Sequence, residues 1–283
     1  MTYAYLNTDF TDAAKAVLPV GDLAIQRGYG VFDFLKVDRG VPLFFQDHMD
    51  RFVASAAKLD LPLRPDREEL RSVIHELVRR NQLDLSGIRL TLTGGVSPDG
   101  YQIAEPNLII TQLPLKERDP GLVGRGLKLI TYPYLRQLPD VKTIDYIMAI
   151  RLQRVIREMQ VDDVLYQHDG LVSECPRTNF FIVTGQQEVR TADSAILEGV
   201  TRKKVLEIAR TVYPVIAGPL HTDEIRSASE AFITSTTKGV LPVTEVDGLP
   251  VGDGRPGPVT RYLDSELSAL KEEYIVAYKA AYR

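Results

Sequence analysis

The chain has 283 residues, of which 44% are hydrophobic and 25% charged, and its formal net charge is −4. This composition is typical of a globular protein, and a small negative charge without a basic block argues against nucleic acid as the main partner. The single cysteine, Cys175, excludes an internal disulfide. The four scattered histidines form no Cys/His cluster at the spacing of a zinc site, so we expect no metal.

Targeting and membrane signals are not found in the sequence. The N-terminal stretch "MTYAYLNTDFTDAAK" has no basic start followed by an apolar run, which a signal peptide requires. No segment approaches the roughly 20 apolar residues of a membrane helix. We therefore predict a cytoplasmic protein without a membrane partner.

The first part of the chain reads as a hairpin, two helices and two strands. Two apolar runs flank the turn Asp38-Arg39-Gly40 within residues 31–45, which predicts the hairpin. "DREELRSVIHELVRRN" is an amphipathic helix with acidic residues in its first turn. "HMDRFVASAAKL" is predicted to be a helix that buries Met49, Phe52, Val53, Ala56 and Ala57. Strands are expected in "IRLTLTGG" and "NLIITQL".

The polar, Pro- and Gly-containing segment 114–126, "PLKERDPGLVGRG", is a candidate linker. It predicts a smaller N-terminal α/β domain of residues 1–117 and a larger C-terminal domain of residues 118–283. In the second part we expect strands in "LKLITYPY", "DDVLYQH", "NFFIVT" and "EAFITST". Helices are expected in "YIMAIRLQRVIREMQ", "VTRKKVLEIARTV" and from about Pro258. Without strict βαβ alternation, the fold class is α/β of the mixed α+β kind, with a mixed sheet.

Two segments could bind an anion. "ILEGVTRKKVLEIA" places Val200 and Thr201 at the start of a helix, where free N–H groups and the helix dipole favour a phosphate. The alternative is that Thr201 is only an N-cap. Residues 234–237 are four hydroxyl residues at the end of a strand, which suit phosphate oxygens or simply strand packing. The helix is expected to bury Val205, Ile208, Ala209 and Val212.

Two charged residues outside these segments are candidates for a site. Arg51 points away from the stripe that includes Met49, where most arginines are solvated, yet arginine is also the side chain best suited to bidentate phosphate contacts. Glu174 lies where a loop meets the sheet. It is either a surface carboxylate or an acid that keeps a heterocyclic nitrogen protonated.

Five motifs in order make these candidates part of one pattern. "HMDRF", "DVKTIDY", "GLVSECPRTNFF", "LEGVTRKK" and "TSTTKGVLPV" together resemble the fold-type IV pyridoxal-phosphate enzymes, a family that includes D-amino-acid transaminases, branched-chain transaminases and aminodeoxychorismate lyases. The resemblance extends from about Tyr29 to about Asp247. It implies two α/β domains with the cofactor between them, and a homodimer in which the partner subunit helps to form the active site.

The resemblance also assigns roles to individual residues. Lys142 matches the lysine that forms a Schiff base with the cofactor, and Glu174 matches the acid that pairs with the pyridine nitrogen. Tyr146 matches a tyrosine that hydrogen-bonds the phenolic oxygen of the cofactor. The phosphate cradle is matched by Arg51, Val200, Thr201, Thr236 and Thr237. A free lysine has a pKa of about 10.4 and is a poor nucleophile at pH 7, so desolvation and a nearby cationic ring are expected to lower the pKa of Lys142.

Two arginines bear on the substrate. Arg27 precedes the first hairpin and Arg177 lies three residues beyond Glu174, an arrangement that resembles an atypical group of D-amino-acid transaminases. The resemblance implies that both bind carboxylates of a D-amino acid of the D-glutamate or D-alanine type, with a 2-oxo acid such as 2-oxoglutarate as acceptor and Tyr29 lining the pocket. A branched-chain L-amino-acid transaminase is the alternative, favoured if Arg27 faces solvent. Aminodeoxychorismate lyase activity is a further one.

Overall fold

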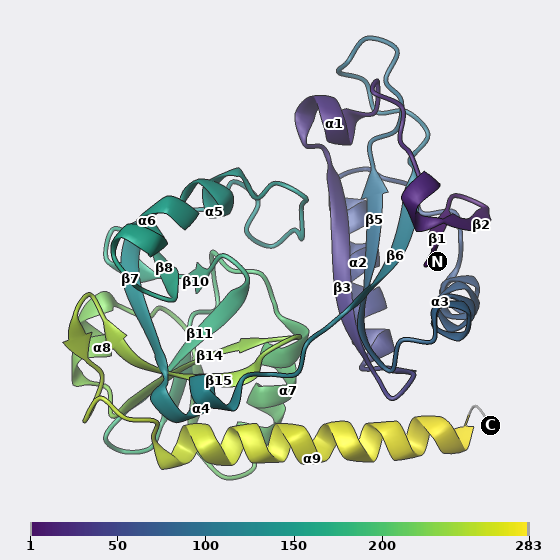
Figure 1. Cartoon of the computed structure of the whole chain (residues 1–283). Helices are drawn as coiled ribbons and strands as arrows, with labels where there is room; N and C mark the ends of the chain where they lie inside the picture. Colours follow the sequence, from purple (N-terminus) through teal and green to yellow (C-terminus); the bar gives the residue numbers. More distant parts are fainter. Residues whose placement is uncertain (1, 282–283) are drawn as a thin grey trace. The chain divides into compact units, whose positions relative to one another are not determined.

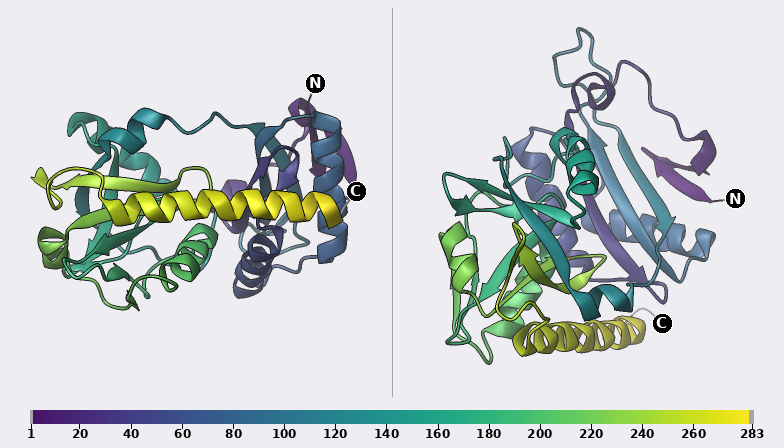
Figure 2. Two further views of the ribbon diagram at one scale, coloured as in Figure 1. Left: turned by 90° about the horizontal axis from the view of Figure 1, so that it is seen from below. Right: turned by 60° about the vertical axis from the view of Figure 1, so that its left-hand side comes forward.

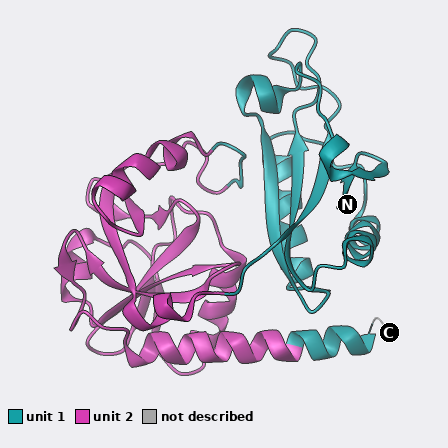
Figure 3. Ribbon diagram, viewed as in Figure 1, with its two compact units in different colours: residues 1–117, 141–145, 274–283 teal, residues 118–140, 146–273 magenta. Residues whose placement is uncertain are grey.

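The computed structural model describes residues 2–281, and its helices and strands form two compact units (Figures 1 and 3). Unit 1 comprises residues 1–117, 141–145 and 274–283, and unit 2 comprises residues 118–140 and 146–273. The segment 141–145 therefore belongs to unit 1, although unit 2 precedes and follows it in the chain. The division into domains of residues 1–117 and 118–283 stays a prediction.

Unit 1 is a six-stranded sheet covered by two helices. Its strands lie in the order β2-β1-β6-β5-β3-β4, and every neighbouring pair is antiparallel. The elements are β1 (Tyr3–Leu6), β2 (Asp9–Asp12), a 3-10 turn (Ala13–Lys15), α1 (Leu23–Arg27), β3 (Gly30–Asp38), β4 (Val41–Pro42), α2 (Phe45–Lys58), α3 (Arg67–Asn81), β5 (Leu85–Thr93) and β6 (Leu108–Pro114).

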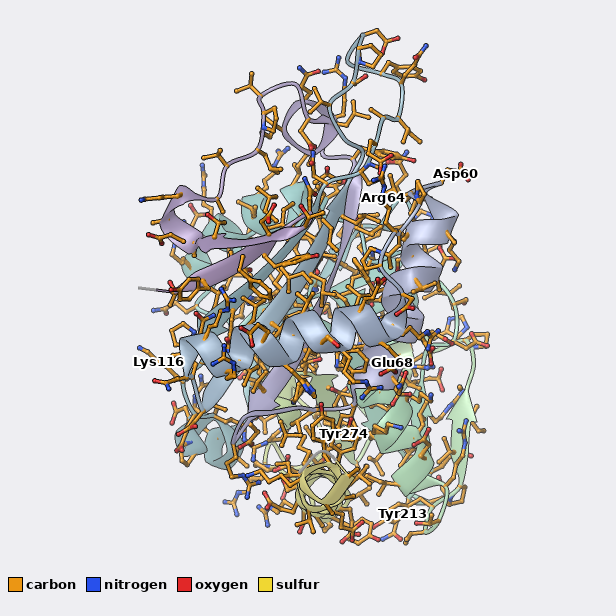
Figure 4. The ribbon with its side chains drawn as sticks, turned by 90° about the vertical axis from the view of Figure 1, so that its right-hand side faces the viewer. Asp60, Arg64, Glu68, Lys116, Tyr213 and Tyr274 are labelled. Atoms are coloured by element: carbon orange, nitrogen blue, oxygen red, sulfur yellow. The ribbon has the colours of Figure 1, made fainter. Side chains whose placement is uncertain are left out.

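The helices α2 and α3 share one core with the sheet of unit 1. Phe52 of α2 and Ile74 of α3 are fully buried in the cluster that contains Ile88 and Ile110 of the strands. The capping box of Asp66 and Glu69 starts α3, close to Glu68 in Figure 4. Ala57, expected in the buried stripe of α2, is exposed because the buried arc of that helix is centred on residues 45, 49, 52 and 56.

Unit 2 is built on a mixed sheet with the path β13-β12-β11-β14-β15-β7-β8-β9, while β10 pairs with β11 and β16 with β15. The elements are α4 (Pro120–Arg125), β7 (Leu127–Pro133), α5 (Ile147–Arg151), α6 (Gln153–Glu158), β8 (Asp163–His168), β9 (Leu171–Val172), β10 (Glu174–Cys175), β11 (Thr178–Val183), β12 (Val189–Thr191), α7 (Val200–Ala209), β13 (Val215–Ala217), α8 (Thr222–Ser227), β14 (Glu230–Ser235), β15 (Gly239–Val246) and β16 (Leu249–Pro250).

The last helix, α9 (Pro258–Ala281), runs without interruption in Figures 1 and 2. Val259 and Leu263 pack with the side chains of α7, β11 and β14 in unit 2. From Tyr274, labelled in Figure 4, the helix belongs to unit 1. There the ring of Tyr274 lies 5.1 Å from that of Phe44, and its hydroxyl oxygen accepts from the Phe45 N–H at 3.2 Å.

The mixed α+β class predicted from the sequence is confirmed, with two local differences. The helix expected over residues 146–160 is two short helices that meet at Leu152, whose side chain is buried. Val212, expected in the buried stripe of α7, is 54% exposed because that helix ends at Ala209. Across residues 2–281, no helix has the length and apolarity needed to cross a membrane.

Candidate active site

A buried group of charged side chains joins β3 to α2 in unit 1. The Asp33 carboxylate is fully buried and accepts from Arg51 Nε and Nη2, both at 2.8 Å. His48 Nδ1 lies 2.7 Å from Asp33 Oδ1. Because His48 and Arg51 are three residues apart on α2, both reach the same carboxylate. The expectation that Arg51 is solvated unless functional is corrected, since its side chain is only 13% exposed and is held by Asp33.

In this group Asp33 and Arg51 form an ion pair, and His48 beside them is neutral. The Arg51 guanidinium and the hydrogen bonds to Asp33 hold the pKa of that carboxyl well below its usual range, against the opposing effect of burial. Burial lowers the pKa of His48, more than the nearby Asp33 charge raises it, and the charge of Lys142 lowers it further. Lys142 thus lies within electrostatic range of His48.

Lys142 lies on a short extended segment that is added to the edge of β3. The Phe32 N–H donates to Lys142 O at 2.9 Å, and the Ile144 N–H donates to Gly30 O at 3.0 Å. The Lys142 N–H donates to Ser55 Oγ of α2 at 3.2 Å. Gly30 is needed here, because a Cβ on it would lie 2.7 Å from Leu92 O and 3.2 Å from the Ile144 side chain. The backbone of Lys142 is therefore fixed by both the sheet and α2.

The amine of Lys142 lies over an aromatic ring that an arginine side chain also contacts. Lys142 Nζ is 4.5 Å from the centre of the buried Phe32 ring, and Arg89 Cζ is 4.0 Å from the same centre. Both cations therefore lie within cation–π distance of one buried ring. Sequence reasoning missed Phe32, Asp33, His48 and Arg89. The spacing of His48, Arg51 and Ser55 along α2 was the only available signal.

In unit 2, Glu174 is a buried carboxylate with partners on both oxygens. Its side chain is 7% exposed, and Arg136 donates to Oε1 through Nε at 2.8 Å and Nη2 at 2.7 Å. The Leu197 N–H donates to Oε2 at 2.9 Å, and Asn179 Nδ2 lies 3.4 Å from the same oxygen. Arg136, Asn179 and Leu197 were not predicted as site residues. These contacts exclude the interpretation of Glu174 as a surface carboxylate.

Arg177 shares a hairpin with Glu174. The strands β10 and β11 pair Cys175 with Thr178, so Pro176 and Arg177 form the two-residue turn between them. Arg177 is exposed at this turn. Cys175 is buried, and its burial raises the pKa of the thiol well above its usual value, so the thiol stays protonated.

The start of α7 has the features of a phosphate-binding helix end. Its N-cap is Gly199, which has no side chain to accept from the first N–H groups, while Val200 and Thr201 are buried. The alternative that Thr201 is the N-cap is wrong, because Thr201 is the second residue of the helix. The helix packs with β14 and β15 through Val205 and Leu206. This donor set suits an anionic group.

The hydroxyl residues after β14 form a turn into β15. Thr236 is half-buried and Thr237 is exposed in the turn between Ser235 and Gly239. Just before this turn, the hydroxyl of Thr234 is buried and has no hydrogen-bond partner within residues 2–281. A buried hydroxyl of this kind is costly unless an acceptor or donor reaches it.

The remaining predicted residues are less constrained. Arg27 ends α1 and is exposed, with Nη1 donating to Gln26 O at 3.0 Å. Its exposure meets the condition that favours the branched-chain alternative. The Tyr29 hydroxyl donates to Leu59 O at 2.8 Å, and burial raises the pKa of that hydroxyl. Tyr146 is half-buried at the start of α5.

Comparison with known proteins gives the chain a family. Residues 30–246 match the model of the amino-transferase class IV family. A D-alanine aminotransferase of Listeria monocytogenes is 29% identical over 268 residues, covering 91% of this chain and 92% of the relative. A putative branched-chain-amino-acid aminotransferase of Methanocaldococcus jannaschii is also 29% identical, covering 95% of this chain and 96% of the relative.

The fold agrees with this family. A branched-chain amino acid aminotransferase from T.th., solved with pyridoxamine 5'-phosphate, superposes with a TM-score of 0.87 at 25% identity, covering 94% of this chain and 92% of that one. The chain belongs to the class IV aminotransferase family and has the fold-type IV architecture. It is an aminotransferase, a class of enzyme that moves amino groups between amino acids and 2-oxo acids.

The residues present fit the cofactor that this family uses. A buried, cation-paired carboxylate suits a protonated ring nitrogen, and a glycine-capped helix start with buried hydroxyls suits a phosphate. A lysine with a fixed backbone suits an aldehyde. Among residues 2–281, no group of three or more His, Cys, Asp or Glu side chains could hold a metal ion.

Proposed function

We propose that the protein is a pyridoxal 5'-phosphate-dependent transaminase that uses Lys142 to hold the cofactor. The observation that carries this proposal is the fixed position of Lys142, whose backbone is bonded to β3 and to Ser55 while its amine lies over Phe32. Glu174 would pair with the ring nitrogen. Arg51, Val200, Thr201, Thr236 and Thr237 would bind the phosphate, and Tyr146 the phenolic oxygen.

Each residue then has a defined task in the reaction. Bound pyridoxal 5'-phosphate supplies an electron-withdrawing ring that stabilises negative charge at the substrate Cα. The Glu174 carboxylate would hold the protonated ring nitrogen, and Arg136 pairs with that carboxylate at 2.7 Å. Lys142 Nζ would serve as the base that moves the proton of the substrate Cα.

Absorbance and chemical trapping test the role of Lys142. The purified protein is expected to be yellow, and borohydride is expected to fix the cofactor to the peptide that contains Lys142, as read by mass spectrometry. Lys142→Ala should abolish both trapping and turnover. The matched control is Lys128→Ala, because Lys128 Nζ pairs with Glu245 at 3.0 Å on the surface of unit 2. Trapping on another lysine, or wild-type turnover by Lys142→Ala, would remove the assignment.

We propose a D-amino acid of the D-alanine or D-glutamate type as the donor and a 2-oxo acid such as 2-oxoglutarate as the acceptor. The support is the similarity to D-alanine aminotransferases together with Arg27 and Arg177, which would bind substrate carboxylates. Guanidinium groups are the best side chains for bidentate carboxylate binding. Tyr29 would line the pocket. We also propose a cytoplasmic homodimer.

A branched-chain L-amino-acid transaminase is the second candidate function. The exposure of Arg27 and the similarity to branched-chain enzymes favour it. A donor panel separates the two: D-alanine with 2-oxoglutarate, D-glutamate with pyruvate, and L-leucine and L-valine with 2-oxoglutarate. Turnover of only the L-amino acids would overturn the D-specific proposal. Release of pyruvate from aminodeoxychorismate without an amino acceptor would instead indicate the lyase.

A further inference from the structure

Asn179 occupies a central position among the proposed cofactor-binding residues of unit 2. It lies on β11, is 5% exposed, and pairs in register with Glu174 of β10 on one side and with Thr234 of β14 on the other. Its neighbours across the sheet are therefore the proposed partner of the ring nitrogen and the buried hydroxyl of Thr234.

The amide of Asn179 has one possible orientation. The atom 2.8 Å from Leu197 O also lies 3.4 Å from Glu174 Oε2, and both of these oxygens are acceptors, so it must be the NH₂ group. The Leu197 N–H donates to the same Glu174 oxygen at 2.9 Å. Asn179, Leu197 and Glu174 thus form a closed set of contacts in which both polar backbone atoms of Leu197 are bound.

The other end of the amide meets the start of α7. A Cβ built on Gly199 would lie 2.3 Å from Asn179 Oδ1, so the Asn179 side chain lies directly against the N-cap of the helix. Gly199 follows Leu197 closely in the chain, with Glu198 between them. One side chain therefore holds the loop at Leu197, contacts the Glu174 carboxylate and determines how closely Gly199 can approach the sheet.

We infer that Asn179 is a positioning residue that fixes the Glu174 carboxylate and the N-terminus of α7 relative to each other. This inference rests on the proposed function, in which Glu174 binds the ring and α7 binds the phosphate of one cofactor. Asn179 itself acts through these two groups. If Asn179 has this positioning role, binding of the cofactor ring and binding of its phosphate are energetically coupled through a residue that need not touch the cofactor.

The test measures the affinity of the protein for pyridoxal 5'-phosphate and for pyridoxal, which lacks the phosphate. In Asn179→Leu the side chain keeps its approximate volume but loses its donor and acceptor. We expect about tenfold to hundredfold weaker binding of pyridoxal 5'-phosphate, as for a lost buried hydrogen bond that displaces its partner. The affinity ratio, defined as the affinity for pyridoxal 5'-phosphate divided by the affinity for pyridoxal, should also fall, because the start of α7 moves.

Gly199→Ala tests the same contact from the helix. The added methyl group must displace Asn179 or the helix start, so the affinity ratio should fall in this variant too. In the double variant Asn179→Ala/Gly199→Ala, the added methyl group no longer meets Oδ1. Gly199→Ala should then lower the affinity ratio less in the Asn179→Ala background than in the wild type. Such non-additivity is the signature of a direct contact.

Thr191→Val is the matched control. Thr191 Oγ1 is buried and donates to Phe180 O at 2.8 Å in the same sheet, so the variant loses a buried hydrogen bond outside the proposed site. It should lower the melting temperature without changing the affinity ratio. If Asn179→Leu behaves like Thr191→Val, Asn179 is only structural and the inference is overturned.

The remaining outcomes are also decisive. If Asn179→Leu does not fold, Gly199→Ala decides alone, and wild-type affinities in that variant overturn the inference. Additive effects in the double variant contradict the contact on which the inference depends. A wild-type protein that binds no pyridoxal 5'-phosphate overturns the proposed function and this inference together, whereas unchanged variants of a protein that binds it overturn only the role of Asn179.

Discussion

Asp33 and Arg51 form a bidentate ion pair in which Nε meets Oδ2 and Nη2 meets Oδ1, each at 2.8 Å. The carboxylate is fully buried, and His48 Nδ1 at 2.7 Å binds it from the same helix. A guanidinium held in this way has lost most of its rotational freedom before any anion arrives. The pair therefore joins strand to helix and also fixes the direction of the arginine that we propose for phosphate binding.

Replacing Asp33 should remove the buried counter-ion of the Arg51 guanidinium. Asp33→Asn keeps the side-chain shape but removes the charge, and we expect the free energy of unfolding to fall by about 3–5 kcal/mol. Urea denaturation measures this effect. Asp38→Asn on the same strand is the control, since Asp38 pairs with Lys36 at 3.6 Å near the surface and should cost less than about 1 kcal/mol. Equal losses in the two variants would contradict the role of the buried pair.

Acid should destabilise the protein through His48. Burial lowers the pKa of His48 in the folded protein. At a pH below the ordinary histidine pKa of about 6.5, the unfolded chain therefore binds more protons than the folded protein. The contribution of His48 to the free energy of unfolding is thus fully present above pH 6.5 and decreases as the pH falls below that value. We expect His48→Gln to be less stable at pH 7.5 but to lose less stability between pH 7.5 and 5.5. Urea denaturation across this range measures the slope.

His168→Gln is the control for this slope. His168 lies at the surface, where its side chain is 63% exposed. Its replacement leaves His48 in place, so the wild-type loss of stability between pH 7.5 and 5.5 should persist. If His48→Gln retains the full wild-type slope, the acid sensitivity arises elsewhere in the protein.

The start of α9 depends on Glu230. This carboxylate is buried and accepts from the Val259 N–H at 3.0 Å, the Thr260 N–H at 2.8 Å and the Thr260 hydroxyl at 2.7 Å. Glu230→Gln replaces one acceptor oxygen with a donor and removes the charge that complements the helix dipole, which should cost about 1–3 kcal/mol. Thermal unfolding measures the loss. Glu207→Gln, at an exposed carboxylate that pairs with Lys204 at 3.3 Å, should have almost no effect.

Arg136 should control how firmly the protein holds its cofactor. Arg136→Gln removes the guanidinium that pairs with the buried Glu174 carboxylate, so the negative charge proposed to hold the ring cation is less well supported. We expect at least about tenfold weaker binding of pyridoxal 5'-phosphate, measured by absorbance titration. Arg125→Gln removes an ion pair with Asp162 at 2.7 Å on the surface and should not alter the titration. Unchanged affinity in Arg136→Gln would refute the prediction.

The elements with strong local patterns could be predicted from the sequence. The hairpin around Asp38-Arg39-Gly40, the helix α3 with its acidic first turn and the helix beginning at Pro258 are confirmed, because turn chemistry, periodicity and helix-end charges act within a few residues. The break at Leu152 was not predicted. The apolar pattern continues through it, and in the structure Leu152 is buried with Val164 and Tyr166.

The sequence by itself determined the mixed class, the main strands and the order of motifs that marks the family, because these depend on neighbouring residues. Only the tertiary structure decided that residues 141–145 join β3, that Asp33 fixes Arg51 and that Arg136 faces Glu174. These contacts link residues 18 to more than 100 positions apart. A local pattern does not record which distant group satisfies a buried charge or an open strand edge, and that choice follows from packing the whole chain.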